Sequence, residues 1–206
     1  MPIIVDYDAG NVRSVQRACE YVGMKAEISA DPDVVARADR VIFPGVGSAA
    51  SAVDTLRDRG LDEALHTFHQ SGRPLLGICL GLQILLQHTE EGDKPCLGMV
   101  EGACERFDFA DRSFKVPHIG WNEVAFTREH PMLSQLKSGD EFYFVHSYYA
   151  KPRHEENNLG TTTYGDRTFC SVIGKENLFA TQFHLEKSGK LGLKLLEAFK
   201  NWSPSC

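Results

Sequence analysis

The sequence predicts an α/β domain in which a mainly parallel central sheet lies between two layers of helices. Short apolar strands alternate with amphipathic helices over residues 1–87, with short connections between them. That alternation is typical of parallel strands covered on both faces. Strand-like runs dominate residues 99–184 instead, which indicates antiparallel extensions of the sheet. We therefore expect one flavodoxin-like, three-layer α/β/α domain over residues 1–206.

The elements of the first part follow from hydrophobic spacing. Strands are expected at residues 3–5, 25–28, 41–43 and 74–78. Helices are expected at residues 12–22, 31–38, 49–59, 61–68 and 80–87. In the second part, strands are expected at 99–107, 121–126, 141–149, 159–164, 169–173 and 178–184. A closing amphipathic helix carries Leu191, Leu195, Phe199 and Trp202.

Composition narrows the classes of function. The net charge is −6 and no run of Lys or Arg occurs, which argues against a nucleic-acid partner. No stretch approaches the roughly 18 apolar residues of a membrane helix, and no secretory signal opens the chain. The six cysteines lack paired spacing, so we expect reduced thiols in a cytoplasmic protein, with Cys206 an exposed one.

The segment Gly77-Ile78-Cys79-Leu80-Gly81 lies between an apolar strand and an apolar helix. Its G-x-C-x-G form is the thiol counterpart of the nucleophile elbow, in which glycines allow a sharp, strained turn. The helix that begins there directs its N–H groups and positive dipole end at the sulfur, which favours thiolate. Leu80 N–H is then placed to receive an oxyanion. The alternative is a buried structural cysteine with glycines for close packing.

A thiol nucleophile requires a base nearby in the fold. His118, in a loop, stays open as a candidate, and His146 ends an apolar strand with Tyr148 two residues further on. His184 also ends an apolar strand, and Glu186 stands two residues further on. Period-two geometry places both side chains on one side of a strand, where the carboxylate can orient the imidazole. The alternatives are a satisfied histidine at a strand end and a solvated carboxylate. His66 and His69 share a helix face as a conceivable metal pair, but solvated surface is the simpler interpretation.

Pro44-Gly45-Val46-Gly47 ends the third expected strand, beside the fourth. The two glycines would let a backbone amide approach the reacting centre and supply a second oxyanion donor. Taken alone, the segment is equally well explained as a turn.

These motifs, together with Leu82-Gln83 and Gln182-Phe183-His184, resemble class I glutamine amidotransferases in order and spacing. The resemblance extends over nearly the whole chain. Three further segments are similar to the glutaminase subunits of imidazole glycerol phosphate synthases, the enzymes of histidine biosynthesis. They are Val5 to Val15, Pro117 to Glu123 and Tyr143 to Tyr149.

The resemblance implies glutamine hydrolysis by Cys79, His184 and Glu186, without a metal or cofactor. It implies that the N–H groups of Leu80 and Val46 form the oxyanion hole. Residues implied to hold the amino-acid end of glutamine are Gly45, Gly47, Gln83, Glu91, Ser147 and Tyr148.

The implied partner is a cyclase subunit with a (β/α)₈ barrel, in a heterodimer. It would use the ammonia on a phosphorylated ribulosyl carboxamide, giving imidazole glycerol phosphate and an aminoimidazole carboxamide ribotide. The resemblance also implies low activity until the partner binds its ligand. The Gly45–Val46 peptide is the candidate switch, because glycine makes a peptide flip inexpensive.

Two departures from the family pattern stand out. Leu185 occupies the position between histidine and glutamate where the family usually has proline, and Asp8 occupies a first-loop position that is usually glycine. Leu185 could loosen the backbone of the triad without removing a catalytic atom. The aspartate at position 8 is expected to affect contacts with the partner subunit more than the reaction.

Three other interpretations stay open. The chain could serve another amidotransferase, such as pyridoxal phosphate synthase, or be a cysteine hydrolase of similar fold acting on other amides. It could also be a non-catalytic regulatory module, although such a chain should lack a triad member.

Overall fold

Five parallel strands form the centre of the molecule. They are β1 (Pro2–Val5), β2 (Glu27–Ser29), β3 (Arg40–Gly45), β4 (Leu75–Cys79) and β13 (Leu178–Thr181). Their order in the sheet is β2-β1-β3-β4-β13 in the computed structural model, which describes residues 1–204. Cys206, expected to be an exposed thiol, lies outside these residues. β3 and β4 are buried almost throughout, as strands covered on both faces must be.

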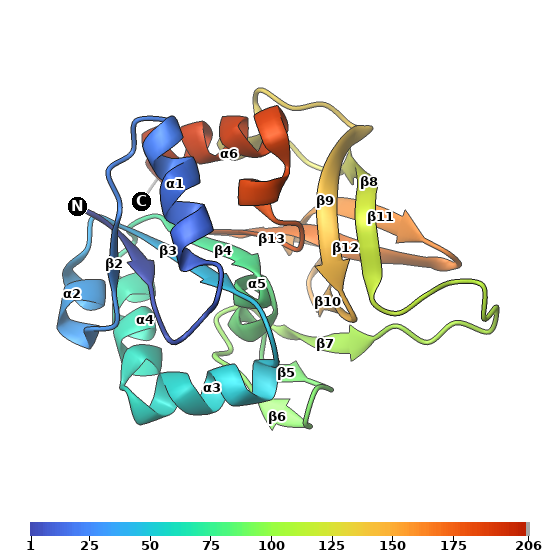
Figure 1. The fold of residues 1–206 in the computed structure, drawn as a ribbon, viewed down its shortest axis with the longest axis horizontal. Helices are drawn as coiled ribbons and strands as arrows, with labels where there is room; N and C mark the ends of the chain where they lie inside the picture. Colours follow the sequence, from blue (N-terminus) through green and yellow to red (C-terminus); the bar gives the residue numbers. More distant parts are fainter. Residues whose placement is uncertain (205–206) are drawn as a thin grey trace.

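Helices cover both faces of this sheet. α1 (Val12–Tyr21) and α6 (Gly189–Asn201) lie on one side, while α2 (Pro32–Arg37), α3 (Ala49–Asp58) and α4 (Leu61–Gln70) lie on the other (Figure 1). α5 (Leu80–Leu85) follows β4 directly and is buried on all sides. α4 buries Leu61, Ala64, Leu65 and Phe68, the spacing that gives a helix one apolar face.

An antiparallel extension continues the sheet beyond β13. It contains β12 (Arg167–Lys175), β10 (Tyr148–Pro152), β7 (Gly102–Arg106), β5 (His88–Thr89) and β6 (Lys94–Pro95) in that order; only β5 and β7 run parallel. A branch of β11 (Asn158–Tyr164), β8 (His118–Phe126) and β9 (Asp140–His146) leaves β12. Short 3₁₀ turns lie at Pro131–Leu133, Glu155–Asn157 and Leu185–Lys187.

The predicted fold class is confirmed, two strand predictions need correction, and two short strands were not predicted. The run 141–149 is two strands, β9 and β10, which separate at Ser147 where the chain crosses from the branch to the main sheet. β13 ends at Thr181 and does not reach His184. The two-residue strands β5 and β6 are too short to show a period in the sequence. Among residues 1–204 no helix has the length and apolar character to span a membrane.

Candidate active site

Cys79 is the last residue of β4 and immediately precedes α5. Its backbone has φ 54° and ψ −105°, a conformation that side chains rarely adopt and that costs of order 1–3 kcal/mol. The side chain is 5% exposed, and Gly45 on β3 is its register partner. The strain expected of a nucleophile elbow is therefore present at the cysteine itself.

The two glycines of the elbow have a different role from the one predicted. Neither has a positive φ; both are required by close approach. A Cβ on Gly81 would stand 1.9 Å from the carbonyl oxygen of Phe43, and one on Gly77 would stand 2.7 Å from Leu85 Cδ1. These contacts press the start of α5 against β3 and hold Cys79 in its strained conformation.

His184 and Glu186 form a buried pair close to the sulfur. Nδ1 of His184 is 2.8 Å from Oε1 of Glu186, and both side chains have no exposed surface. Because the carboxylate accepts, Nδ1 carries the proton in the neutral ring. Nε2 has no hydrogen-bond partner within residues 1–204. That arrangement leaves one ring nitrogen free for proton transfer.

His184 and Glu186 are paired as predicted, but the structural reason predicted for their pairing is wrong. His184 does not end a strand, because β13 stops three residues earlier. His184 instead precedes the 3₁₀ turn Leu185–Lys187, and this turn brings the carboxylate of Glu186 back to the ring. The period-two argument therefore does not apply here.

Asn11 is a site residue to which sequence analysis gave no role. Its Nδ2 donates to Oε1 of Glu186 at 3.0 Å, across the full length of the chain. The side chain is 6% exposed, at the start of α1. Only its place in the family-like first segment could have drawn attention to it. Glu186 Oε1 thus accepts from both the histidine and Asn11.

The electrostatic environment favours a protonated His184 beside an ionised Glu186. Burial lowers the pKa of His184, but the Cys79 sulfur and the Glu186 carboxylate outweigh it and raise that pKa to about 10. Burial raises the pKa of Glu186, yet its bonds to His184 and Asn11 leave that pKa below its ordinary value. At neutral pH the imidazole is therefore protonated beside an ionised carboxylate.

A cavity of about 380 Å³ opens beside Cys79 and His184. The other predicted site residues that line it are Val46, Gly47, Leu80, Gln83, Glu91, Ser147 and Tyr148. Gly45 lies behind the nucleophile: a Cβ there would stand 2.0 Å from the hydroxyl of Tyr7, which donates to Pro44 O. Lining residues that sequence analysis did not assign are Pro117, Val145, His146 and Lys187.

Two of the predicted glutamine ligands have further partners. Glu91 Oε2 accepts from the backbone N–H of Ala49 at 2.6 Å and so caps α3. Gln83 Nε2 donates to the carbonyl of Tyr148 at 2.8 Å and to Oε1 of Gln182 at 3.2 Å. The cavity is therefore walled by side chains that are already fixed.

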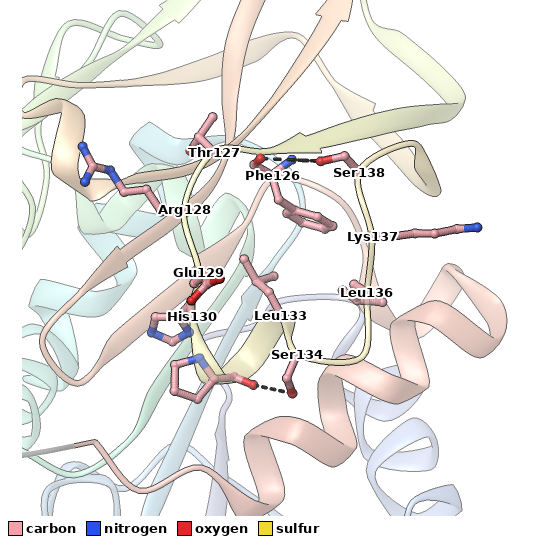
Figure 2. Close-up of a pocket in the computed structure, with 11 residues that line it drawn as sticks. Phe126, Thr127, Arg128, Glu129, His130, Leu133, Ser134, Leu136, Lys137 and Ser138 are labelled. Atoms are coloured by element: carbon pink, nitrogen blue, oxygen red, sulfur yellow. Dashed lines mark hydrogen bonds between the residues drawn. The ribbon is translucent and has the colours of Figure 1, made fainter.

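A larger cavity, of about 720 Å³, lies within the loop from Phe126 to Ser138 and contains none of the predicted site residues. Phe126 and Leu133 project into this loop, while Arg128 and Lys137 point away from it (Figure 2). Chemistry therefore favours the smaller cavity, where the strained cysteine meets a buried histidine.

The departure at Asp8 has a structural counterpart. Asp8 has φ 73°, which lies in the left-handed region that favours glycine. Its carboxylate forms an ion pair with Arg59 at the end of α3. This contact ties the first loop to the helix that follows the Pro44–Gly47 segment.

A cysteine on a strained strand-to-helix turn, beside a buried histidine–carboxylate pair, has the arrangement of a cysteine hydrolase. The family model "Glutamine amidotransferase class-I" matches residues 3–201. The chain belongs to this family.

Several relatives carry one description. The "Imidazole glycerol phosphate synthase subunit HisH" of Desulfovibrio desulfuricans is 48% identical over 204 residues, which are 97% of this chain and 93% of that protein. The protein of the same description from Maridesulfovibrio salexigens is 46% identical, over 97% and 95% of the two chains.

Solved structures resemble the fold at low identity. A structure described as a glutamine amidotransferase has a TM-score of 0.73 at 19% identity, covering 96% of this chain and 98% of that one. The structure of PurLQS from Thermotoga maritima gives 0.74 at 18% identity, covering 97% of each chain. At these identities the likeness concerns the fold alone.

Proposed function

We propose that this chain is the glutaminase subunit of an imidazole glycerol phosphate synthase, acting in histidine biosynthesis. The observation that carries the proposal is the strained Cys79 beside the buried His184–Glu186 pair, at the floor of a cavity that suits an amino acid. The shared description of relatives 46–48% identical over nearly the whole chain supports the pathway. Residues 1–206 then form one amidotransferase domain.

The reaction begins with attack of the Cys79 sulfur on the amide carbon of glutamine. The carbonyl oxygen takes the negative charge and is held by the N–H groups of Leu80 and Val46. His184 gives its Nε2 proton to the amide nitrogen, the C–N bond breaks, and ammonia leaves behind a thioester. Glu186 keeps the imidazole oriented and stabilises its positive charge.

The second half of the reaction restores the enzyme. His184, now neutral, takes a proton from water, and the resulting hydroxide attacks the thioester carbon. The C–S bond breaks, glutamate is released, and the sulfur and imidazole return to their starting state. Hydrogen bonds from Asn11 and His184 keep Glu186 in place throughout.

The amino-acid end of glutamine is assigned to the cavity wall away from Cys79. Glu91 supplies a negative charge for the α-ammonium group, since only its Oε2 is engaged with Ala49. Gln83 and the backbone of Gly47, Ser147 and Tyr148 complete this subsite, whereas Gly45, predicted with them, is not among the residues that line the cavity.

Ammonia set free in water would be protonated and lost to the synthase reaction, so we propose a partner at the mouth of the cavity. Val46 and Lys187 line the cavity and are exposed, and Pro117, which also lines it, directly precedes β8. β8 exposes 60% of Ile119 and 55% of Trp121. An apolar surface beside a reactive site is typical of a docking face. The partner is a cyclase subunit with a (β/α)₈ barrel, in a heterodimer in the cytoplasm, where reducing conditions keep Cys79 free.

The test is glutamate release from glutamine, by this chain alone and with a cyclase subunit and its ribulosyl carboxamide substrate. Strong stimulation by the liganded cyclase is expected. Release without stimulation would keep the glutaminase and remove the pathway, whereas no release in either condition would indicate a non-catalytic module. Stimulation by the synthase subunit of another amidotransferase would reassign the partner.

A further inference from the structure

Two buried histidines beside the cavity have no part in the reaction proposed above. His118 on β8 and His146 at the end of β9 are register partners in the antiparallel β8–β9 pair. Their side chains are 3% and 5% exposed, and His118 Nδ1 is 3.0 Å from His146 Nε2. His146 also lines the cavity. A buried polar pair of this kind requires every nitrogen to have a partner.

The partners fix the direction of each hydrogen bond. The carbonyl of Tyr148 can only accept, so His146 Nδ1 carries the proton that it donates at 2.8 Å. His146 Nε2 therefore accepts from His118 Nδ1. Asn122 Nδ2, 3.3 Å from His118 Nε2, donates to that nitrogen and also to the carbonyl of Thr163. All three bonds are directed toward the carbonyl of Tyr148, and both rings are neutral.

Burial supports the neutral state of both rings. It lowers the pKa of His118 to about 4, and it lowers the pKa of His146 to about 3 against the opposing hydrogen bond to Tyr148. A neutral ring offers one donor and one acceptor, which is what this chain of bonds requires.

The chain of bonds continues to the nucleophile. The carbonyl of Tyr148 also accepts from Gln83 Nε2 at 2.8 Å, and the same nitrogen donates to Gln182 Oε1 at 3.2 Å. Gln182 Nε2 then lies 3.8 Å from the Cys79 sulfur. The Tyr148 carbonyl is thus the point where bonds from the histidines and from Gln83 meet.

β8 connects this network to the surface. Its side chains alternate, so His118 and Asn122 face inward while Ile119 and Trp121 face outward. The inner face of the strand contacts the cavity-lining His146 through His118, and the outer face is the proposed docking surface. A displacement of β8 would therefore act on the histidine pair first.

We propose that His118 and His146 are positioning residues for glutamine binding: through the Tyr148 carbonyl they hold the Ser147–Tyr148 wall of the cavity in place. The proposal rests on the proposed function, because it concerns the affinity of the same cavity for glutamine. Its signature is a rise in KM for glutamine that exceeds any fall in kcat, as loss of ground-state binding gives.

The test compares two replacements of one ring in the complex with the cyclase subunit. In His146→Asn the amide can occupy the place of Nδ1 and still donate to Tyr148. In His146→Gln the amide reaches the place of Nε2 and abandons Tyr148. We expect His146→Gln to raise KM about tenfold, the effect of one lost buried hydrogen bond, and His146→Asn to raise it several-fold less. Asn122→Ala, at the partly buried outer end of the chain of hydrogen bonds, should raise KM about threefold.

His130→Gln is the matched control, because it removes a partly buried ring that packs on Phe179 and Trp202 and does not line the cavity beside Cys79. The complex with His130→Gln should have the wild-type KM, although its Tm should fall about as much as that of His146→Gln. Equal KM values for His146→Asn and His146→Gln would overturn the proposal, as would an unchanged KM in both His146→Gln and Asn122→Ala. Wild-type complex that releases no glutamate would overturn the proposed function, and this inference with it.

Discussion

The two sides of the cavity position their reactive groups by different means. On the nucleophile side, Cys79 is held by the main chain, since Gly77 and Gly81 allow backbone and side-chain contacts too close for any Cβ. On the base side, His184 is held by side chains, through Glu186 and then Asn11. Both groups are buried to a similar degree.

This difference in how the two sides are held predicts what a mutation on each side changes. Backbone packing is decided by sterics, so an error there costs the fold several kcal/mol. A hydrogen-bonded side chain can be lost at about 1–3 kcal/mol while the chain still folds. We therefore expect changes to the glycines that pack around Cys79 to affect stability, and changes to the hydrogen-bonded side chains behind His184 to affect the reaction.

The largest effect is expected from a matched pair at the nucleophile. Cys79→Ala and Cys79→Gly should each lower glutaminase kcat at least about a thousandfold, because the attacking sulfur is gone. Only glycine adopts φ 54° without strain, so Cys79→Gly should be the more stable of the two by about 1 kcal/mol. Glutamate release and urea unfolding measure both quantities. Retained turnover in either variant would end the nucleophile assignment.

Gly81→Ala should lower the free energy of unfolding by about 3 kcal/mol or more, because its Cβ would meet the Phe43 carbonyl at 1.9 Å. The control is Gly10→Ala, whose Cβ would make an ordinary 3.6 Å contact with Val46. Thermal unfolding of the two variants measures this difference in stability. Similar Tm values for both variants would contradict the idea that close packing holds the elbow.

The pKa of His184 provides a test of the electrostatics on the base side. The Cys79 sulfur and Glu186 raise this pKa from 6.5 to about 10 against the effect of burial. In Cys79→Ala the contribution of the sulfur is lost, so the pKa should fall and the ring should lose its proton at lower pH. NMR titration of the His184 ring measures this change. A pKa that is the same in both proteins would show that Glu186 alone governs the imidazole.

Asn11→Ala should lower kcat about tenfold, because Glu186 loses a charge-assisted hydrogen bond. The matched control is Gln16→Ala on the same helix, where the lost bond goes to the carbonyl of Ala26. In steady-state kinetics, kcat should fall in Asn11→Ala and not in Gln16→Ala, while the Tm values of the two variants stay close. Equal kcat values would remove Asn11 from the base assembly.

The smallest effect is expected at the position where the family usually has proline. His184 has φ −85° and ψ 108°, the extended conformation that a following proline requires, and Leu185 opens a 3₁₀ turn, where proline is tolerated. Leu185→Pro should therefore change kcat by less than about threefold, at some cost in packing because Leu185 is buried. A large rise in kcat would show that the leucine loosens the base side.

Sequence reasoning reached the strands, the main helices and Cys79 because each has a local signal. Apolar runs of period two or 3.6 mark the elements, and G-x-C-x-G between two of them marks the elbow. It misjudged the strand end before His184, because an apolar run does not record where pairing stops. It gave no role to Asn11, which lies 175 positions from its partner Glu186.

What the sequence by itself determined is the class of fold, the candidate nucleophile and the likeness to amidotransferases, because these depend on short-range patterns. Only the tertiary structure decided that the elbow glycines serve close packing and that a 3₁₀ turn joins His184 to Glu186. It alone brought His118 and His146 together beside the cavity. Such contacts join residues distant in sequence, and their geometry exists only once the strands have paired.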